Sequence, residues 1–316
     1  MDEVNLMASQ RKIILVTRRT RLQELVFKHN TEEQAEFYIQ SRGEDFSDYR
    51  QEHQSYRNAL NAIETALSAL GRVQTLDRDF LANFIFAQDD IVVVLGQDGL
   101  VANTLKYLSG QPTVAINPDP SRFDGVLLPF QVKESAKVLT DVLRGKFNCK
   151  SITMAQAELN DGQKMVAVND FFIGQRGHAS ARYHLLQSGE GEFQSSSGII
   201  VSTGLGSTGW LKSVITGSFG IAQANGWTDD RQIPLSNFGW DEARLVYSVR
   251  EPFPSRNTGT RMLFGQVSDS APLTIASAMP ENGVIFSDGM LDDCIEFNAG
   301  AVVNIALRPV QGQLVC

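Results

Sequence analysis

The feature that most constrains the fold is an apolar run, Ile91–Leu95, that leads directly into a turn of sequence GQDG at positions 96–99. An unbroken aliphatic run predicts a strand buried on both faces, as in a parallel sheet, and a helical pattern continues to Leu108. The turn glycines favour positive φ or a close backbone approach. Asp98 is then expected at the carboxyl end of a central strand, where open α/β sheets bind ligands. An equally good interpretation is that Asp98 only forms the turn or caps the helix.

Strands and helices alternate over the first half of the chain, which predicts βαβ units and a parallel sheet. The helix patterns have apolar residues at three- and four-residue steps and end near glycine. The expected strands are Arg11–Thr17, Val73–Leu76, Ile91–Leu95 and Thr113–Ile116, and the expected helices are Tyr56–Leu70, Gly99–Leu108 and Lys133–Leu143.

The pattern changes at Lys150, after which short alternating runs are separated by turn sequences such as Asn160-Asp161-Gly162. This pattern is typical of antiparallel β structure. We therefore expect a disordered leader over residues 1–10, an α/β domain over 11–148 and a β-rich domain over 149–302. Because no low-complexity linker separates them, the cleft between the two domains is the expected site.

The charge balance argues against nucleic acid as a partner. A net charge of −8 and a pI near 5.1 leave no broad basic field. Arginines cluster locally at Arg18, Arg19 and Arg21, either as a solvated loop or facing an anionic ligand.

Cysteine usage and hydropathy point to the cytoplasm. Cys149, Cys294 and Cys316 are odd in number and far apart, which disfavours a disulfide framework and gives no metal-ligand spacing. No segment approaches the ~20 apolar residues of a membrane span, and the N-terminus lacks the apolar core of a secretory signal. We therefore expect a cytoplasmic protein without a membrane partner.

Two further motifs follow strands in the β-rich half. Asn169-Asp170 comes after MVAV, and a loop with four hydroxyls and three glycines, Ser202–Gly209, comes after GIIV. A hydroxyl-rich strand-to-helix turn suits a phosphate or ribose ligand. Each motif alone is equally consistent with a tight turn or a helix N-cap. The loop does not match the Walker pattern, and the first strand lacks a Rossmann fingerprint.

Taken in order, these motifs resemble the NAD kinase family, most closely its mitochondrial type. That family has a Gly-Gly-Asp-Gly turn, similar to positions 96–99, and an Asn at the end of the next strand, similar to Asn117. Its Asn-Glu pair is similar to Asn169-Asp170, and its glycine/threonine loop is similar to Ser202–Trp210. Arg-Glu-Pro at 250–252 and Asp-Gly at 288–289 also fall where relatives have them. The resemblance spans roughly Lys12 to Leu307.

The resemblance implies an α/β nucleotide-binding domain and a β-rich dinucleotide-binding domain, with a C-terminal segment of about 303–316 returning to the first. It also implies transfer of the ATP γ-phosphoryl group to the adenosine-ribose 2′-hydroxyl of NAD, which yields NADP, with Mg²⁺ on the phosphates. Small-molecule nucleotides are the implied partners, in a homo-oligomer that is expected to be a dimer.

The same resemblance implies roles for individual residues, none of them a dedicated metal ligand. Asp98 would be the general base, or would organise the metal and phosphates, while Asn169 and Asp170 would hold ribose hydroxyls and part of the base edge. The other implied nucleotide-binding residues are Gly96, Gln97, Gly99, Asn117, Thr203, Gly206, Ser207, Thr208 and Trp210.

Three departures from the family pattern affect this interpretation. Gln97 replaces a glycine, Leu100 replaces a threonine, and Asp170 is one methylene shorter than the family's Glu. Gln97 crowds the donor side most. The alternatives are therefore a catalytically weak, regulatory NAD(H)- or nucleotide-binding protein and, third, a relative of the diacylglycerol-type lipid kinases.

Overall fold

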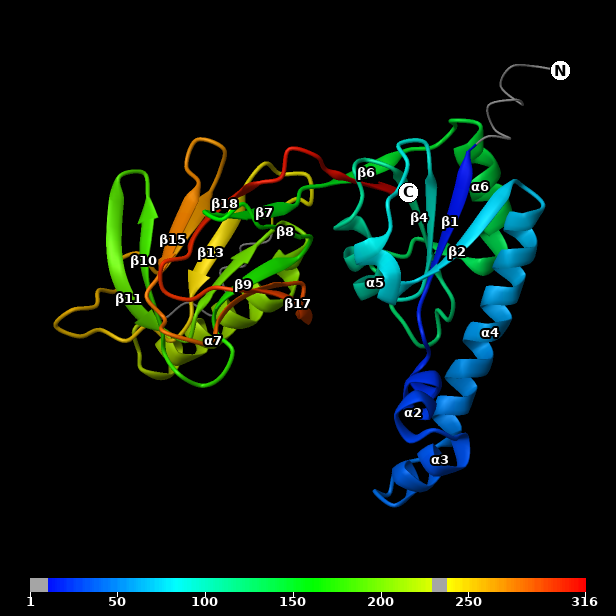
Figure 1. The fold of residues 1–316 in the computed structure, drawn as a ribbon, viewed down its shortest axis with the longest axis horizontal. Coiled ribbons are helices and arrows are strands. Elements are labelled where there is room, and N and C mark those ends of the chain that lie inside the picture. The colour runs from blue at the N-terminus through cyan, green and yellow to red at the C-terminus, as the bar shows by residue number, and fades with distance from the viewer. Residues whose placement is uncertain (1–10, 229–237) are drawn as a thin grey trace. The chain divides into compact units, whose positions relative to one another are not determined.

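The computed structural model describes residues 11–228 and 238–316, which divide into two compact units. Unit 1 contains the chain up to Lys150 together with Gln313–Cys316, and unit 2 contains Ser151–Gly312 (Figure 1). The leader expected over residues 1–10 lies outside the described residues.

Unit 1 is built on a mostly parallel sheet whose strand order is β2-β1-β3-β4-β19-β6, with β5 paired to β4. The neighbours of β1, β3 and β4 within this sheet run parallel to them. The last residues of the chain form β19, whereas β18 (Val302–Leu307) belongs to unit 2. The strands are β1 (Lys12–Thr17), β2 (Arg72–Asp77), β3 (Ile91–Leu95), β4 (Pro112–Asn117), β5 (Phe130–Gln131), β6 (Cys149–Ile152) and β19 (Gly312–Val315).

Helices cover this sheet and complete its core. All of β3 is buried, as its apolar run predicts, and Tyr56, Ile63 and Leu67 of α4 pack against it in one apolar cluster. No helix among the described residues has the length and apolar character needed to cross a membrane. The elements are α4 (Ser47–Ser68), η1 (Arg78–Asn83), α5 (Asp98–Leu105), η2 (Val132–Glu134) and α6 (Ser135–Leu143).

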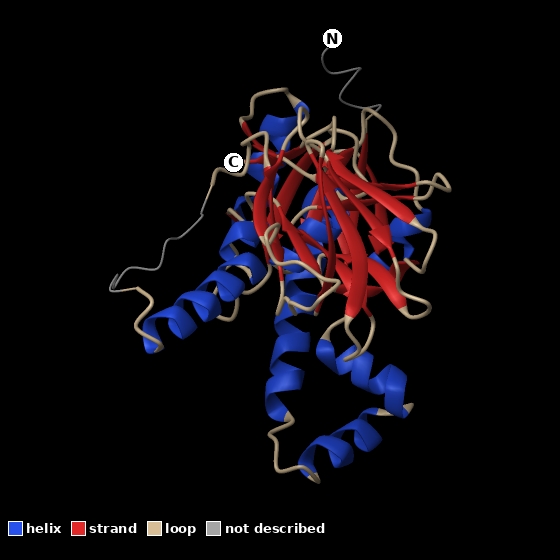
Figure 2. Ribbon diagram, turned by 90° about the vertical axis from the view of Figure 1, so that its left-hand side faces the viewer, coloured by secondary structure: helices blue, strands red, loops and turns tan. Residues whose placement is uncertain are grey.

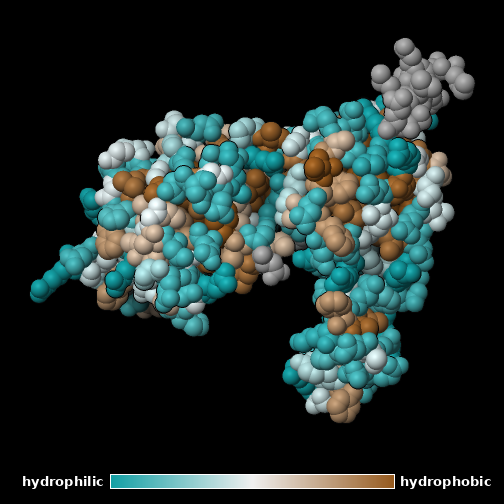
Figure 3. Space-filling model, viewed as in Figure 1, coloured by the Kyte–Doolittle hydropathy of each residue, from teal (hydrophilic) through white to brown (hydrophobic). Residues whose placement is uncertain are grey.

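The first half of α4 extends beyond the sheet and is joined there by α2 (Arg21–His29) and α3 (Glu32–Gln40), as Figures 1 and 2 show. Thr20 begins α2 with a reciprocal capping box to Gln23. This helical extension has its own small core and a largely hydrophilic surface in Figure 3.

The arginines of this region are paired with acidic residues. The Arg19 and Arg21 side chains remain 40% and 43% exposed, so only Arg18 departs from the expected solvated loop. Arg18 is nearly buried and its guanidinium lies 3.0 Å from the Glu52 carboxylate. Arg21 pairs with Glu52 and Asp48, and the same Asp48 pairs with Arg122 beyond β4. Arg18 and Arg21 pair with acidic residues of α4, and Arg19 pairs with Asp79 of η1. These partners are far away in sequence, so the run alone does not reveal them.

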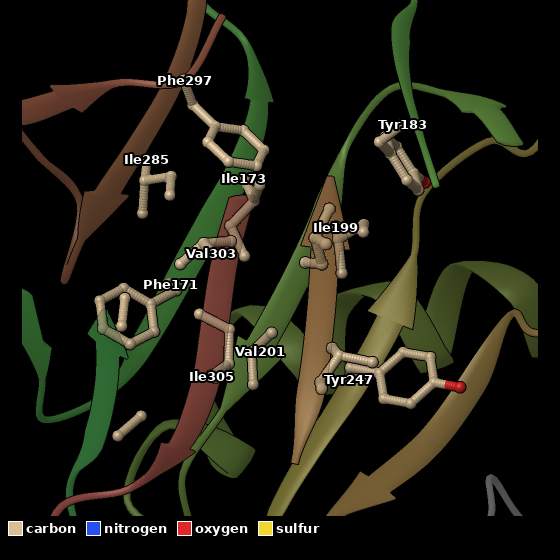
Figure 4. Close-up of a cluster of buried hydrophobic side chains, with 14 of the residues drawn as sticks. Phe171, Ile173, Tyr183, Ile199, Val201, Tyr247, Ile285, Phe297, Val303 and Ile305 are labelled. Carbon is tan, nitrogen blue, oxygen red and sulfur yellow. The ribbon is translucent and has the colours of Figure 1, made fainter. Parts of the chain in front are cut away.

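Unit 2 consists of two antiparallel sheets and one long helix, so the two units together confirm the predicted fold class. The sheet orders are β11-β10-β15-β18-β7-β8 and β14-β13-β12-β9-β16-β17. Side chains from both sheets, including Phe171, Tyr183 and Ile305, meet in one apolar core (Figure 4). The elements not yet given are β7 (Ala155–Leu159), β8 (Lys164–Ala167), β9 (Asp170–Gln175), β10 (Ala181–Gln187), β11 (Glu190–Ser196), β12 (Ile199–Ser202), η3 (Gly206–Thr208), α7 (Trp210–Ala224), β13 (Leu245–Val249), β14 (Phe264–Val267), β15 (Leu273–Ser277), β16 (Gly283–Ser287) and β17 (Met290–Glu296).

Candidate functional site

In unit 1, the 96–99 turn joins the end of β3 to the start of α5. Gln97 is the N-cap residue, and Asp98 is the first residue of the helix, so the interpretation of Asp98 as a cap is wrong. Positive φ is not used at Gly96 or Gly99 either. Gly96 is needed for close packing, because a Cβ there would lie 2.6 Å from the Leu100 side chain. At Gly99 a Cβ would meet open space.

Asp98 is held by the loop that follows β4. Its Oδ1 accepts a hydrogen bond of 2.7 Å from the Leu127 amide, and its side chain is half-buried. Its Oδ2 has no hydrogen-bond partner in the part of the chain that the structure describes. One oxygen therefore orients the carboxylate, and the other is left for a ligand.

Asn117 orders the same loop. The side chain is 4% exposed, donates from Nδ2 to the Phe123 carbonyl at 2.9 Å and accepts at Oδ1 from the Asp119 amide at 3.0 Å. Gly125 has φ +67°, and a Cβ there would lie 2.7 Å from Asn117 Nδ2. Asn117 therefore supports the loop whose Leu127 amide orients Asp98, which places it beside the turn as a structural partner.

Gln97 has an extended φ of −115°, and its side chain makes no hydrogen bond within the described residues. If ATP is the donor, as the resemblance to the NAD kinase family implies, Gln97→Gly should raise kcat/KM for ATP, because the backbone at the turn becomes accessible to phosphates. The glycine adds unfolded-state freedom, which costs roughly 0.5–1 kcal/mol of stability. Parallel ATP kinetics and thermal melting separate these effects, and lower activity with ATP would show that Gln97 contributes a contact of its own.

In unit 2, Asn169 and Asp170 stand at the β8–β9 turn, with Asp170 the first residue of β9. Asp170 is 7% exposed, and its carboxyl group has no hydrogen-bond partner among the described residues. Burial, together with the nearby Asp288 carboxylate, raises the pKa of Asp170 to about 7. The Asn169 side chain is half-buried and likewise makes no hydrogen bond there. A buried carboxyl without a donor and with a shifted pKa is typical of a ligand site.

The hydroxyl-rich loop lies directly against this pair. Thr203 Oγ1 donates to the carbonyls of Val168 at 2.6 Å and Asn169 at 3.1 Å, and the Thr203 amide also donates to Asn169 O at 2.9 Å. A Cβ at Gly206 would collide with Asn169 O, so only glycine fits that position. The structure thus brings the second and third motifs together.

The hydroxyls of this loop are not equivalent. Thr203 and Ser207 are buried and donate to backbone carbonyls, Ser207 to Gly204 O at 2.7 Å. Thr208 is exposed and makes one long bond of 3.4 Å, to Leu205 O. Of the loop hydroxyls expected to touch a ligand, Thr208 is therefore the one available, while Thr203 and Ser207 hold the loop itself.

Trp210 opens α7 and belongs to an aromatic cluster. Its ring stacks on Phe172 with centroids 5.7 Å apart and planes 10° apart, and Phe286 stacks on Phe172 at 4.9 Å. The Arg250 guanidinium lies 5.5 Å from the Trp210 ring, in cation–π range. Beside the cluster, a mostly apolar groove of about 970 Å³ runs between α7 and the end of β13.

Sequence reasoning missed two contributors to the site of unit 2. Arg250 and Asp288 were noted only as positions shared with relatives, without a structural role. The structure places Arg250 over Trp210 and brings Asp288 against the amides of the Asn169–Asp170 turn. The Asp-Gly sequence at 288–289 does indicate a hairpin turn, but not what its carboxylate contacts.

The fold consists of two compact units, and each unit carries its own cluster of candidate site residues. No family model matches the chain. Similarity to solved structures covers 97% of it, with a TM-score of 0.59 and 14% identity to a yeast NADH kinase complexed with NADH, over 83% of that chain. An NAD kinase from Archaeoglobus fulgidus in complex with ATP gives a TM-score of 0.57 and 16% identity, over 94% of its chain.

Sequence comparison points to the same group of proteins. The chain is 36% identical over 138 residues to an NAD kinase of Aromatoleum aromaticum, and 30% identical over 131 residues to one of Ralstonia nicotianae. These segments cover 41% and 39% of the chain and less than half of each relative, 45% and 43%. In sequence and in fold, this chain is therefore similar to NAD kinases. The closer likeness to the mitochondrial type stays a prediction.

Proposed function

We propose that this protein is an NAD kinase, which transfers the γ-phosphoryl group of ATP to the 2′-hydroxyl of the adenosine ribose of NAD. The observation that carries the proposal is the buried, donor-free carboxyl of Asp170 beside Asn169, because ribose hydroxyls are the hydrogen-bond donors it lacks. The named relatives support the choice of dinucleotide and donor.

In the proposed reaction, the ribose 2′-oxygen forms a bond to the γ-phosphorus while the bond from that phosphorus to the β,γ-bridging oxygen breaks and ADP leaves. The hydroxyl proton passes to the free Oδ2 of Asp98. The Leu127 amide, which donates to Oδ1, keeps this carboxylate oriented, so that Asp98 needs no change of side-chain conformation before the transfer. Asn117 contributes by holding the loop that carries Leu127.

On the acceptor side, Asn169 and Asp170 hold ribose hydroxyls and the base edge, and Thr208 and Trp210 contact the dinucleotide. Thr203, Gly206 and Ser207 keep the loop in the shape that allows this. The backbone at Gly96, Gln97 and Gly99 lies along the phosphates of the donor.

The donor is expected to carry Mg²⁺. Among the described residues, no group of three or more His, Cys, Asp or Glu side chains forms a metal site. This lining fits Mg²⁺, because that ion keeps several waters and binds mainly through nucleotide phosphates, which leaves Asp98 Oδ2 to accept the proton. The ion would neutralise charge on the phosphoryl group. We further propose that the enzyme is a cytoplasmic homodimer, which light scattering of the purified protein and fractionation of cells test.

Incubation of the purified protein with Mg²⁺, ATP and NAD, coupled to an NADP-specific dehydrogenase, tests the proposed reaction. NADP formation supports it. Binding of NAD without turnover would favour the regulatory binding protein, and phosphorylation of diacylglycerol in place of NAD would favour the lipid kinase.

Asp170→Ala is expected to raise the KM for NAD and to leave the KM for ATP nearly unchanged. Losing hydrogen bonds to buried hydroxyls costs about 1–3 kcal/mol each when the partner is left unsatisfied, which corresponds to a KM increase of at least several-fold. Steady-state kinetics with each substrate varied in turn measures the KM for NAD and the KM for ATP separately. An effect confined to ATP would overturn the assignment of Asp170 to the acceptor side.

A further inference from the structure

The hairpin turn between β16 and β17 holds the Asn169–Asp170 segment through hydrogen bonds. Asp288 lies between β16 and β17 with φ +54°, next to Gly289 with φ +74°. Its Oδ1 accepts hydrogen bonds from the amides of Val168 at 3.1 Å, Asn169 at 2.6 Å and Asp170 at 3.3 Å. The Asp288 amide in turn donates to Asp170 O at 2.9 Å.

The other side of the same turn is held by Thr203, which donates to the carbonyls of Val168 and Asn169. One carboxylate therefore binds three successive amides, while one hydroxyl binds two of the carbonyls. Among the described residues, the Asn169 and Asp170 side chains are then the polar groups of the turn that lack a hydrogen-bond partner.

The same contacts bring two carboxyl groups together. Three amide donors stabilise the charged form of Asp288. No described residue donates to the Asp170 carboxyl group, which is buried beside that charge. On its other side, β12 places the uncharged Ser202 opposite Asp170 in the sheet. The pKa of Asp170 is raised to about 7 by burial first and by the Asp288 charge second.

We propose that Asp288 is the positioning residue of the dinucleotide site: it fixes the 168–170 turn, and its charge makes the capture of ribose hydroxyls by Asp170 sensitive to pH near neutrality. The role in binding ribose rests on the proposed function. The hydrogen bonds of Asp288 to the turn and its electrostatic effect on Asp170 do not. Ionised Asp170 accepts two hydroxyl donors, whereas the protonated form loses part of that capacity. NAD affinity therefore falls as the pH drops below neutrality.

Two variants separate the hydrogen bonds that Asp288 accepts from the effect of its charge. Asp288→Asn keeps an Oδ1 acceptor and tolerates positive φ, but removes the charge. Asp288→Gly also tolerates positive φ, but it removes both the Oδ1 acceptor and the charge. Asp161→Asn is the matched control, because it makes the same chemical change in another turn of unit 2, where Asp161 Oδ1 accepts from the Gln163 amide.

Two measurements need no nucleotide. Carboxyl ¹³C NMR of the full chain follows the titration of Asp170, and hydrogen exchange follows the amides of 168–170. We expect Asp288→Asn to move the Asp170 midpoint to lower pH with the amides still protected. Asp288→Gly should also lower the midpoint and should speed amide exchange on the order of tenfold. Asp161→Asn should change neither quantity.

Calorimetric titration of NAD from about pH 5 to pH 9 completes the test. In the wild type, Kd should rise by up to about tenfold per pH unit below the Asp170 midpoint, and Asp288→Asn should move that rise to lower pH. An unchanged Asp170 midpoint in Asp288→Asn, or unchanged exchange in Asp288→Gly, overturns the role of Asp288. If NAD does not bind the wild type at any pH but the ligand-free results are as expected, the proposed function is wrong. The structural and electrostatic roles of Asp288 are then still supported.

Discussion

Asp98→Asn should lower kcat by about 10²–10⁴-fold, the range that a positioned general base contributes, and leave NAD affinity nearly intact. The asparagine retains an oxygen that accepts from the Leu127 amide, so the β3–α5 turn keeps its shape. What changes is the free Oδ2 position, which becomes an amide nitrogen that accepts no proton. Steady-state kinetics, calorimetric titration with NAD and thermal melting measure the three quantities.

The matched control for this variant is Asp124→Asn, which makes the same chemical change at an exposed position of the loop that holds Asp98. It should show near wild-type kcat and melting temperature. If Asp98→Asn instead keeps activity close to that of the control, Asp98 only supports the turn, and the proton acceptor has to be sought elsewhere.

The second large effect concerns stability and pH. Because the pKa of Asp170 rises from about 4 when unfolded to about 7 when folded, the native state retains a proton that the unfolded state has lost. This group therefore makes the free energy of unfolding fall as the pH rises from about 4 to about 7. Asp170→Asn removes that penalty, and near pH 8 it should be more stable than the wild type by at most about 4 kcal/mol.

Urea unfolding at a series of pH values tests this result. The gain of Asp170→Asn should grow between about pH 4 and pH 7 and stay constant above. Asp161→Asn provides a control of opposite sign, because hydrogen bonds from Gln163 lower the pKa of Asp161, whose contribution is present at neutral pH and lost in acid. A stability difference for Asp170→Asn that does not vary with pH would show that the Asp170 pKa is not raised in the folded protein.

Much of the fold could be predicted because its signals are local. The apolar run Ile91–Leu95 has a single stable environment, a strand buried on both faces, and the spacing from Tyr56 to Leu70 marks a helix of the observed register. Helix α2 escaped detection because it is short and polar. It buries only Leu22, and its Arg21 is paired with Asp48 and Glu52 of α4, farther along the chain.

The site was less predictable, and for a related reason. The sequence motifs show where polar side chains follow strands, but not which of them turn inward. Thr203 and Thr208 are both threonines in one loop, yet one is buried on two carbonyls and the other is exposed. Asp288 is more than a hundred residues from the amides it binds, and only the pairing of β9 with β16 reveals the contact.

The position of β19 has a consequence for how the molecule is assembled. Gln313–Cys316 belongs to unit 1, and β19 lies between β4 and β6 in its sheet, although all of unit 2 precedes it in the chain. Unit 2 is therefore an insertion within unit 1 in terms of chain topology. During synthesis, β4 leaves the ribosome long before β19 is made. The parallel sheet of unit 1 can therefore be completed only after unit 2 has been synthesised.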